Sequence, residues 1–254
     1  MPATLDHQSL VQPSNLKVSL WRYMDLSKFA DLLQSRALVF VRSDHLGDPF
    51  EGSLPEMNAN EFKSIMANRG SLPEAHPFKN MTDAEFEQLS KLTYKKNKNT
   101  LQMVYISCWH MNEAESAAMW KLYSKSSDAV CIRTDYETIA SVLPSDSYMG
   151  VVNYLDYKTA AIQTGNMFYR FMTKRRSFSH EREARAIVMD FGAFGAPSAP
   201  WIKKVPVDIA TLVKAIYVSP EAPDWFRDVV ADLTEKYGLS VHVEKSELNA
   251  LPLF

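Results

Sequence analysis

The chain of 254 residues contains little glycine and has no strong charge of either sign. Only eight glycines occur, and neither G-x-G-x-x-G nor G-x-x-x-x-G-K-[ST] is present, so the usual glycine-rich phosphate loops are excluded. A nucleotide would have to be held by side chains or by other turns. With 28 lysines and arginines against 30 acidic residues, a net charge of −2 gives the whole chain no electrostatic preference for nucleic acid or anionic membrane.

Cysteine and long apolar runs are also scarce. Cys108 and Cys131 are the only cysteines, too few for a disulfide framework or for a thiolate zinc site without other ligands. Their apolar neighbours indicate reduced core residues. No apolar segment approaches the roughly 18 residues that a membrane span needs, and the first residues lack the charged and apolar regions of a signal peptide. We therefore expect a cytoplasmic protein without a membrane partner.

Core-forming residues are plentiful, at 46% hydrophobic and 11% aromatic. Runs rich in β-forming residues predict short strands, among them 17–23 and 37–41. Asp25 is the expected N-cap of the helix between these two strands, and Thr82 with Glu85 predicts a capping box at the start of a later helix. Strands and helices follow one another without strict alternation, which predicts an α+β fold. Residues 158–176 are expected to be helical. The predicted organisation is a loose N-terminal arm at 1–15 and a single domain at 16–254, which ends in a C-terminal β-α-β extension at 205–245.

The stretch H-E-R-E-A-R, which contains Glu181, Glu183 and Arg185, carries the most chemical information. If this stretch is a strand, all three side chains leave the same face, because successive residues point to opposite sides. Burying such ions without partners costs several kcal/mol each, so they are either open to water or held by counter-charges such as Arg22 or Lys174. The alternative, which composition favours slightly, is an exposed helix with an i,i+4 pair worth about 0.2 to 0.5 kcal/mol.

An acidic loop offers a second candidate site. Residues 42–52 are dense in turn formers and predict an irregular segment. This loop carries four acidic or imidazole groups: Asp44, His45, Asp48 and Glu51. Together with the late glutamates, such groups would suit a divalent cation, as in metal-dependent nucleases. The simpler interpretation is that Asp48, which precedes a proline, forms a turn.

Other chemically suggestive residues have ordinary explanations that are more common. Trp109 could stack on a ligand ring, although aromatic residues usually pack in the core. Cys108 lies near His110, but a buried structural cysteine is favoured over a thiol nucleophile. Basic residues at 174–176 and 95–98 could contact a nucleic-acid backbone, whereas a solvated face is the more frequent outcome for charge runs.

Four sequence blocks, in this order, resemble the bacterial domain of unknown function 2971. They are L-W-R-Y-M from Leu20, D-H-L-G-D-P-F-E-G from Asp44, S-C-W-H-M-N-E-A-E-S-A-A-M-W-K-L-Y from Ser107, and K-R-R-S-F-S-H-E-R-E-A-R from Lys174. The resemblance implies a family-like core at about 21–190. The name of that family implies no activity.

A more distant resemblance is to ADP-ribosyltransferase-like proteins, in which a first strand with a basic residue, a short helix, a second strand and a late glutamate follow in order. This resemblance implies a split-sheet core with helical insertions, and NAD as a substrate rather than a tightly bound cofactor. The residues that it assigns to NAD are Arg22, Tyr23, Ser107, Trp109 and Arg185, with Glu181 or Glu183 as the catalytic acid.

The leading hypothesis is therefore an enzyme that transfers ADP-ribose from NAD or hydrolyses NAD, with no metal ligand assigned and with the acceptor open. The first alternative is a metal-dependent nuclease that uses Asp44, Asp48, Glu51 and the late glutamates. The second is a non-catalytic binding or sensor module of a defence system, such as phage defence. Nucleic acid stays open as a partner.

Overall fold

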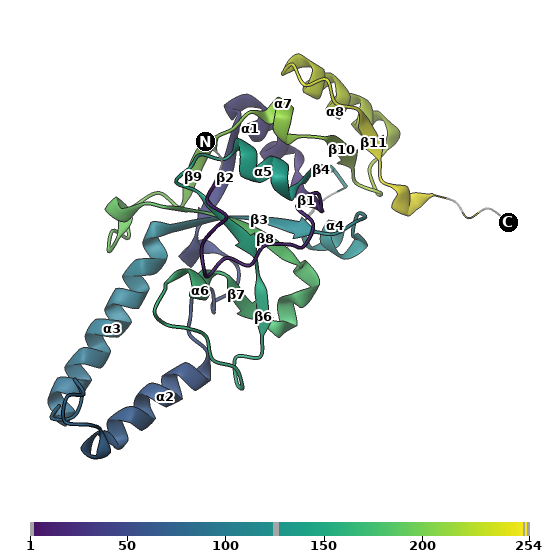
Figure 1. The fold of residues 1–254 in the computed structure, drawn as a ribbon. Coiled ribbons are helices and arrows are strands. Elements are labelled where there is room, and N and C mark those ends of the chain that lie inside the picture. The colour runs from purple at the N-terminus through teal and green to yellow at the C-terminus, as the bar shows by residue number, and fades with distance from the viewer. Residues whose placement is uncertain (1–2, 124–126, 251, 253–254) are drawn as a thin grey trace.

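A computed structural model describes residues 3–123, 127–250 and 252. In these residues helices lie around a central sheet (Figure 1). In these residues nine strands form one sheet, with β11-β10-β4-β1-β3-β2-β9 as its main path and with β8 pairing β3 and β5. The bounds are β1 Ser19–Asp25, β2 Ala37–Arg42, β3 Val104–Met111, β4 Ala129–Asp135, β5 Tyr148–Val151, β8 Glu183–Met189, β9 Ile202–Pro206, β10 Ala215–Val218 and β11 Val243–Lys245. A separate parallel pair joins β6 Asn153–Leu155 and β7 Thr173–Arg175.

The helices lie between these strands. They are α1 Leu26–Ser35, α2 Glu56–Ala67, α3 Asp83–Met103, α4 Ala117–Tyr123, α5 Tyr136–Val142, α6 Phe168–Phe171, α7 Ile209–Leu212 and α8 Asp224–Lys236. Short 3-10 helices are η1 Ser43–His45, η2 Arg69–Ser71, η3 Arg176–Glu181, η4 Phe191–Ala193 and η5 Glu247–Asn249. Among the described helices, none has the length and apolar character that crossing a membrane requires.

Local signals explain where several helices begin. Asp25 caps α1, because its carboxylate accepts the backbone N–H of Lys28, as the sequence predicts. Thr82 and Glu85 form the predicted capping box at the start of α3. The predicted helical insertion is present, since α2 and α3 connect β2 to β3 and extend away from the sheet in Figure 1.

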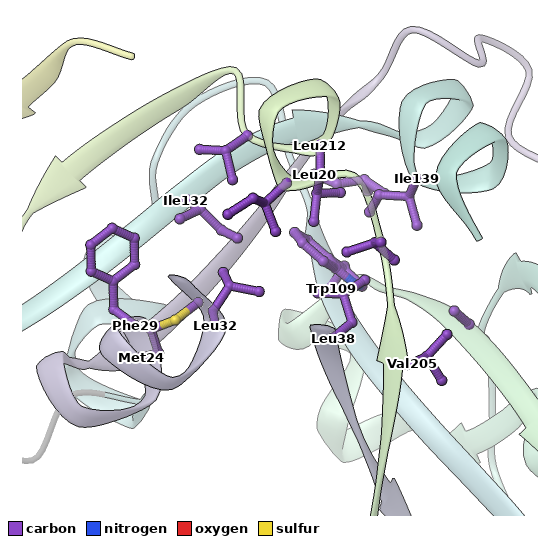
Figure 2. Close-up of a cluster of buried hydrophobic side chains, with 14 of the residues drawn as sticks. Leu20, Met24, Phe29, Leu32, Leu38, Trp109, Ile132, Ile139, Val205 and Leu212 are labelled. Atoms are coloured by element: carbon purple, nitrogen blue, oxygen red, sulfur yellow. The ribbon is translucent and has the colours of Figure 1, made fainter. Parts of the chain in front are cut away.

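The main hydrophobic core covers one face of the sheet (Figure 2). Leu20 of β1 and Leu38 of β2 are buried there, and Phe29 of α1 and Leu212 of α7 pack over them. Fully burying a side chain of this size contributes about 1.5 to 3 kcal/mol. Trp109 of β3 lies in the same cluster, which places the middle of β3 beneath the core.

The C-terminal β-α-β unit agrees with the prediction. β10 pairs with β4 in antiparallel fashion, and after α8 the chain returns as β11 parallel to β10. Gly238 adopts a positive φ of 76° just after α8, the conformation that glycine tolerates best at a helix end. The expected helix at 158–176 is wrong, because only α6 is helical there and β7 follows it.

The expectation of a loose arm does not fit residues 3–15, whereas residues 1–2 lie outside the described chain. Ala3 and Leu10 are buried, and single β-bridges join Thr4 to Tyr148 and Val11 to Val151 of β5. Ala3 packs in the main hydrophobic core and Leu10 packs in a second apolar cluster. The expectation of a loose arm depended on the lack of a helix or strand pattern in this segment. Burial of apolar side chains holds the segment in place without such an element.

Candidate active site

The central sheet splits along one edge of β3. The other edge pairs with β8 over residues 104–110. On the split edge of the described chain, β2 pairs with residues 105–106 and β1 with residues 110–111. Residues 107–109 therefore lie where β1 and β2 diverge, and a cavity of about 650 Å³ opens at this point.

This cavity is called the cleft below. Its walls come from β1, α1, β2, β3, α4 and β9, and Glu181 and Glu183 also line it. Its volume lies within the range of about 300 to 1,000 Å³ that is usual for small-molecule sites. Because side chains alternate along a strand, Arg22 and Trp109 approach the cleft from one face of the sheet and Glu183 approaches it from the other.

Arg22 spans the split without meeting an acid. Its Nη1 donates to Ser107 Oγ at 2.8 Å, its Nη2 donates to the Val39 carbonyl at 3.0 Å, and its guanidinium lies 5.4 Å from the centre of the Trp109 ring. Of the five N–H donors of a guanidinium, two thus have acceptors, and no carboxylate in the described chain forms an ion pair with Arg22. Burial lowers the pKa of Arg22 to about 10, so the group stays cationic at neutral pH.

The aromatic residues assigned from the sequence are largely buried at the cleft wall. Trp109 is 1% exposed and packs in the main core, so only part of its ring faces the cleft. The hydroxyl oxygen of Tyr23 accepts the backbone N–H of Ser116 at 2.8 Å, and its ring packs edge-on against Trp120 at 4.9 Å. Both residues form wall surface and also stabilise the core.

A strained turn brings the two glutamates together. Glu181 ends η3, Glu183 begins β8, and Arg182 between them adopts the left-handed conformation with φ of 42°. The backbone N–H of Met111 donates to the Arg182 carbonyl at 2.8 Å and fixes this turn against β3. A non-glycine residue in this conformation costs free energy, on the order of 1 kcal/mol or more, and such strain is concentrated at functional sites.

The strand predicted to include Glu181 begins only at Glu183, two residues later. Glu183 and Arg185 share a face of β8, as predicted, but Glu181 reaches the same place through the turn rather than by alternation. The alternative of an exposed helix does not fit, because Glu181 is 8% and Glu183 4% exposed.

The glutamates belong to a buried ion network. Lys174 Nζ donates to Glu181 and, at 2.7 Å, to Glu183 Oε1. Arg185 Nε donates to Glu183 Oε2 at 2.5 Å, and the two Nη groups of Arg185 bind both carboxylate oxygens of Glu51 at 2.7 and 2.9 Å. Of the two counter-charges proposed from the sequence, Lys174 fills that role and Arg22 does not.

The environment separates the pKa values of the two carboxyl groups. Burial, together with the neighbouring Glu183, raises the pKa of Glu181 to about 7. Burial alone would also raise the pKa of Glu183, but Arg185 and Lys174 hold it well below its usual range. Glu183 is therefore a permanently ionised group, whereas Glu181 can hold a proton near neutral pH.

His110 is a cleft residue that the sequence analysis did not assign. Its Nδ1 lies 2.6 Å from the Glu181 carbonyl oxygen, and its Nε2 is buried without a hydrogen-bond partner in the described chain. Its register opposite Glu183 on β8 is the signal that would identify it, and this pairing is not visible in the sequence.

The acidic loop does not gather its groups into one site. Asp44 pairs with Arg42, Asp48 with Arg175, and Glu51 with Arg185. The imidazole of His45 stacks on Trp201 at 4.4 Å. No group of three or more potential ligands among the described residues is placed to hold a metal ion. The loop thus supplies separate ion pairs that stabilise the fold around the cleft.

The structure brings together most of the residues assigned from the sequence, in two sets. Arg22, Ser107 and Trp109 meet on one side of the split, and Glu181 and Glu183 meet on the other, all except Ser107 lining the cleft directly. Arg185 is fully buried behind Glu183 and does not line the cleft. Its geometry is that of a residue that positions the carboxylate rather than one that touches a ligand.

Cys108 is only partly buried, so the expectation of a buried structural cysteine does not hold in full. Cys108 lines the cleft, but burial raises the pKa of its thiol far above neutral pH. The thiolate, which is the nucleophilic form, is therefore negligible at neutral pH.

A comparison with solved structures finds a likeness at low sequence identity. No family model matches the chain, and no curated protein matches it in sequence. A solved structure of Thermus sp. 2.9 DarT in complex with ADP-ribosylated ssDNA is similar at 8% identity and a TM-score of 0.41, covering 93% of this chain and 97% of the other. A likeness this distant assigns no activity, and the resemblance to the domain of unknown function 2971 stays a prediction.

Proposed function

We propose that the protein is an ADP-ribosyltransferase-like enzyme that binds NAD in the cleft and breaks the bond between nicotinamide and ribose, so that ADP-ribose passes to an acceptor or to water. The observation that carries this proposal is the charge arrangement of the cleft. One wall presents a guanidinium without an acid partner, and the other presents two carboxylates that lysine and arginine hold in place.

Arg22 is suited to the diphosphate of a dinucleotide. A partly buried cation without a counter-ion carries a desolvation cost, and a bound anion offsets that cost. The planar guanidinium also matches the geometry of phosphate oxygens and donates to two of them at once. Its remaining N–H donors thus replace the glycine-rich loop that the sequence lacks, while Ser107 and Val39 orient the group.

The glutamates are suited to the reacting ribose. Loss of nicotinamide develops positive, oxocarbenium-like charge on the sugar, which a fixed carboxylate stabilises best when water is excluded. Glu183 has this character, because Lys174 and Arg185 keep it ionised and immobile. Glu181 is suited to act as the general base, because a carboxyl group with a pKa near 7 can accept the proton of an attacking hydroxyl or water.

The two alternatives receive less support. A metal-dependent nuclease would need the carboxylates of the acidic loop to converge, and each of Asp44, Asp48 and Glu51 is instead paired with a different arginine. A purely structural set of motifs would leave Glu181 and Glu183 separated or at the surface. They are buried together and line a cavity, which favours chemistry over a binding or sensor role alone.

Nucleic acid is the acceptor that we propose to test first. Arg176, His180 and Arg182 are exposed in the segment that carries Glu181, so they are available to phosphate groups at this side of the cleft. Lys174 and Arg175, in contrast, are used in ion pairs within the protein.

The test is release of nicotinamide from NAD by the purified protein, with and without a single-stranded oligonucleotide. Glu183→Gln removes the fixed negative charge at the reacting ribose, and we expect at least a hundredfold loss of rate. Glu181→Gln should lower the rate mainly when an acceptor is present, because it removes the proton acceptor.

Glu137→Gln is the matched control. Glu137 is a half-exposed glutamate whose side chain pairs with Lys17 away from the cleft, so its variant should keep the parent rate. Melting temperatures of all variants separate lost chemistry from lost folding. Unchanged nicotinamide release in well-folded Glu181→Gln and Glu183→Gln proteins would contradict the proposal.

A further inference from the structure

His110 occupies the wall of the cleft on the same face as the glutamates. It lies in β3 directly opposite Glu183 of β8, and its side chain is 7% exposed. His110 and Trp109 both line the cleft, and each has a buried nitrogen without a hydrogen-bond partner in the described chain. Trp109 Nε1 is a donor only, whereas the imidazole of His110 can accept.

The hydrogen bond of His110 determines which nitrogen carries the proton. Its Nδ1 lies 2.6 Å from the backbone carbonyl of Glu181, and a carbonyl oxygen only accepts, so Nδ1 must donate. Burial lowers the pKa of His110, which favours the neutral ring. Nε2 is therefore left with a free lone pair. The turn at Arg182 thus fixes the tautomer of His110, because it positions the Glu181 carbonyl that accepts from Nδ1.

Away from the glutamates, the cleft wall beside His110 is aromatic and apolar. The ring of Tyr23 lies 6.4 Å away at a tilt of 58°, and Met119 and Tyr123 line the same side. A flat ring fits between such walls, and a buried acceptor gains most from a ligand with an N–H group.

We infer that His110 Nε2 accepts a hydrogen bond from the carboxamide N–H of an aromatic amide ring, and that it thereby places the leaving ring of the dinucleotide beside Glu183. This inference rests on the proposed function, because the ring is the nicotinamide of NAD. His110 is a ligand-positioning residue in the cleft. It adds selectivity for an amide over rings of the same shape that lack the N–H group.

Calorimetric titration with two dinucleotides tests this role. The dinucleotides are NAD and its 3-acetylpyridine analogue, in which a methyl group replaces the amide nitrogen and removes the donor. We expect the parent protein to bind NAD about tenfold more tightly, a difference of ~1.4 kcal/mol.

Two substitutions separate the functions of the two ring nitrogens. The amide of His110→Asn can still donate to the Glu181 carbonyl in place of Nδ1 but provides no acceptor at the position of Nε2, so the preference for NAD should fall to about one. His110→Gln extends an amide oxygen toward the position of Nε2 and should restore part of the preference. His242→Asn, at an exposed histidine outside the cleft, should keep the parent ratio.

The outcomes distinguish the inference from the proposed function. Equal binding of the two dinucleotides by the parent protein would overturn the role of His110 and leave NAD binding intact, whatever the folding of the variants. A retained preference in well-folded His110→Asn protein would overturn it as well. If the parent protein binds neither dinucleotide, the proposed function fails and the inference fails with it.

Discussion

Arg22 and Arg185 are both arginines of the central sheet, the first partly and the second fully buried, yet their electrostatic surroundings are opposite. Arg185 is fully buried, with both oxygens of Glu51, one oxygen of Glu183 and the Phe171 carbonyl as acceptors. Arg22 has only a hydroxyl and a carbonyl as acceptors among the described residues. The difference indicates that Arg185 completes a permanent ion network, whereas Arg22 keeps donors for an anion that comes and goes.

The largest expected effect comes from removing the paired cation. Arg185→Met leaves two buried carboxylates, Glu51 and Glu183, without their main partner, so we expect a loss of about 3 to 5 kcal/mol in the free energy of unfolding. Arg22→Met removes two hydrogen bonds and leaves no charge unpaired, which should cost about 1 to 2 kcal/mol. Urea unfolding of both variants measures this difference.

Ligand binding should depend more on Arg22 than on Arg185, the reverse of the order for stability. Arg22→Met should weaken binding of ADP-ribose by roughly 10- to 100-fold, because a hydrogen bond to a charged group contributes about 1.5 to 3 kcal/mol. Equal destabilisation by the two substitutions, combined with unchanged binding of ADP-ribose by Arg22→Met protein, would remove the distinction between the two arginines.

The stability of the paired network should depend on pH. The pKa of Glu181 is about 7 in the folded protein, above its ordinary value of 4.5. A folded state that binds the proton more tightly is stabilised at low pH, so this contribution is lost as the pH rises from about 4.5 to about 7. Glu183 has the opposite sign, because its lowered pKa contributes stability that is lost as the pH falls below about 4.5.

Urea unfolding of the parent protein and of Glu181→Gln, at several pH values between about 5 and 8, tests this sign. Because the two proteins differ only at position 181, the difference between their two curves isolates the contribution of Glu181. We expect the parent protein to lose stability relative to the variant as the pH rises. Parallel curves would show that Glu181 titrates as an ordinary surface carboxyl group.

The smallest expected effect comes from the residue that orients the unpaired cation. Ser107→Ala removes the hydroxyl that accepts from Arg22 Nη1, which should weaken NAD binding about three- to tenfold, in line with a contribution of about 1 kcal/mol. Calorimetric titration measures this change, and Ser141→Ala on α5, which lies outside the cleft, is the control. A loss as large as that of Arg22→Met would mean that Ser107 itself binds the ligand.

Local patterns in the sequence predicted much of the fold. The apolar strands of residues 17–23 and 37–41, the cap at Asp25 and the C-terminal β-α-β unit each depend on neighbours within a few positions, and each is present. Such signals act over one or two turns of chain, which is why they can be recognised without knowledge of tertiary contacts.

The candidate site depended on contacts that no local pattern encodes. Arg22 and Ser107 are 85 positions apart and meet because β1 and β2 diverge along β3. Alternation along a strand predicted that Glu183 and Arg185 share a face. The left-handed turn that brings Glu181 to them could not be predicted, because Arg182 stands where a glycine would usually indicate such a turn. The helix expected at 158–176 failed for a related reason. Lys174 pairs with two glutamates that follow it in sequence, and those tertiary contacts outweigh local propensity.

The segment that leads into β1 has a consequence for how molecules of this protein behave toward one another. β5 pairs with β8 along one side, and residues 3–15 lie against its other side, with Gly150 close to the backbone of Val11. A bare strand margin would offer its amide and carbonyl groups to a second molecule and so invite aggregation. By occupying that margin, the segment opposes strand-to-strand self-association, and it does so with hydrogen bonds and apolar contacts rather than with surface charge.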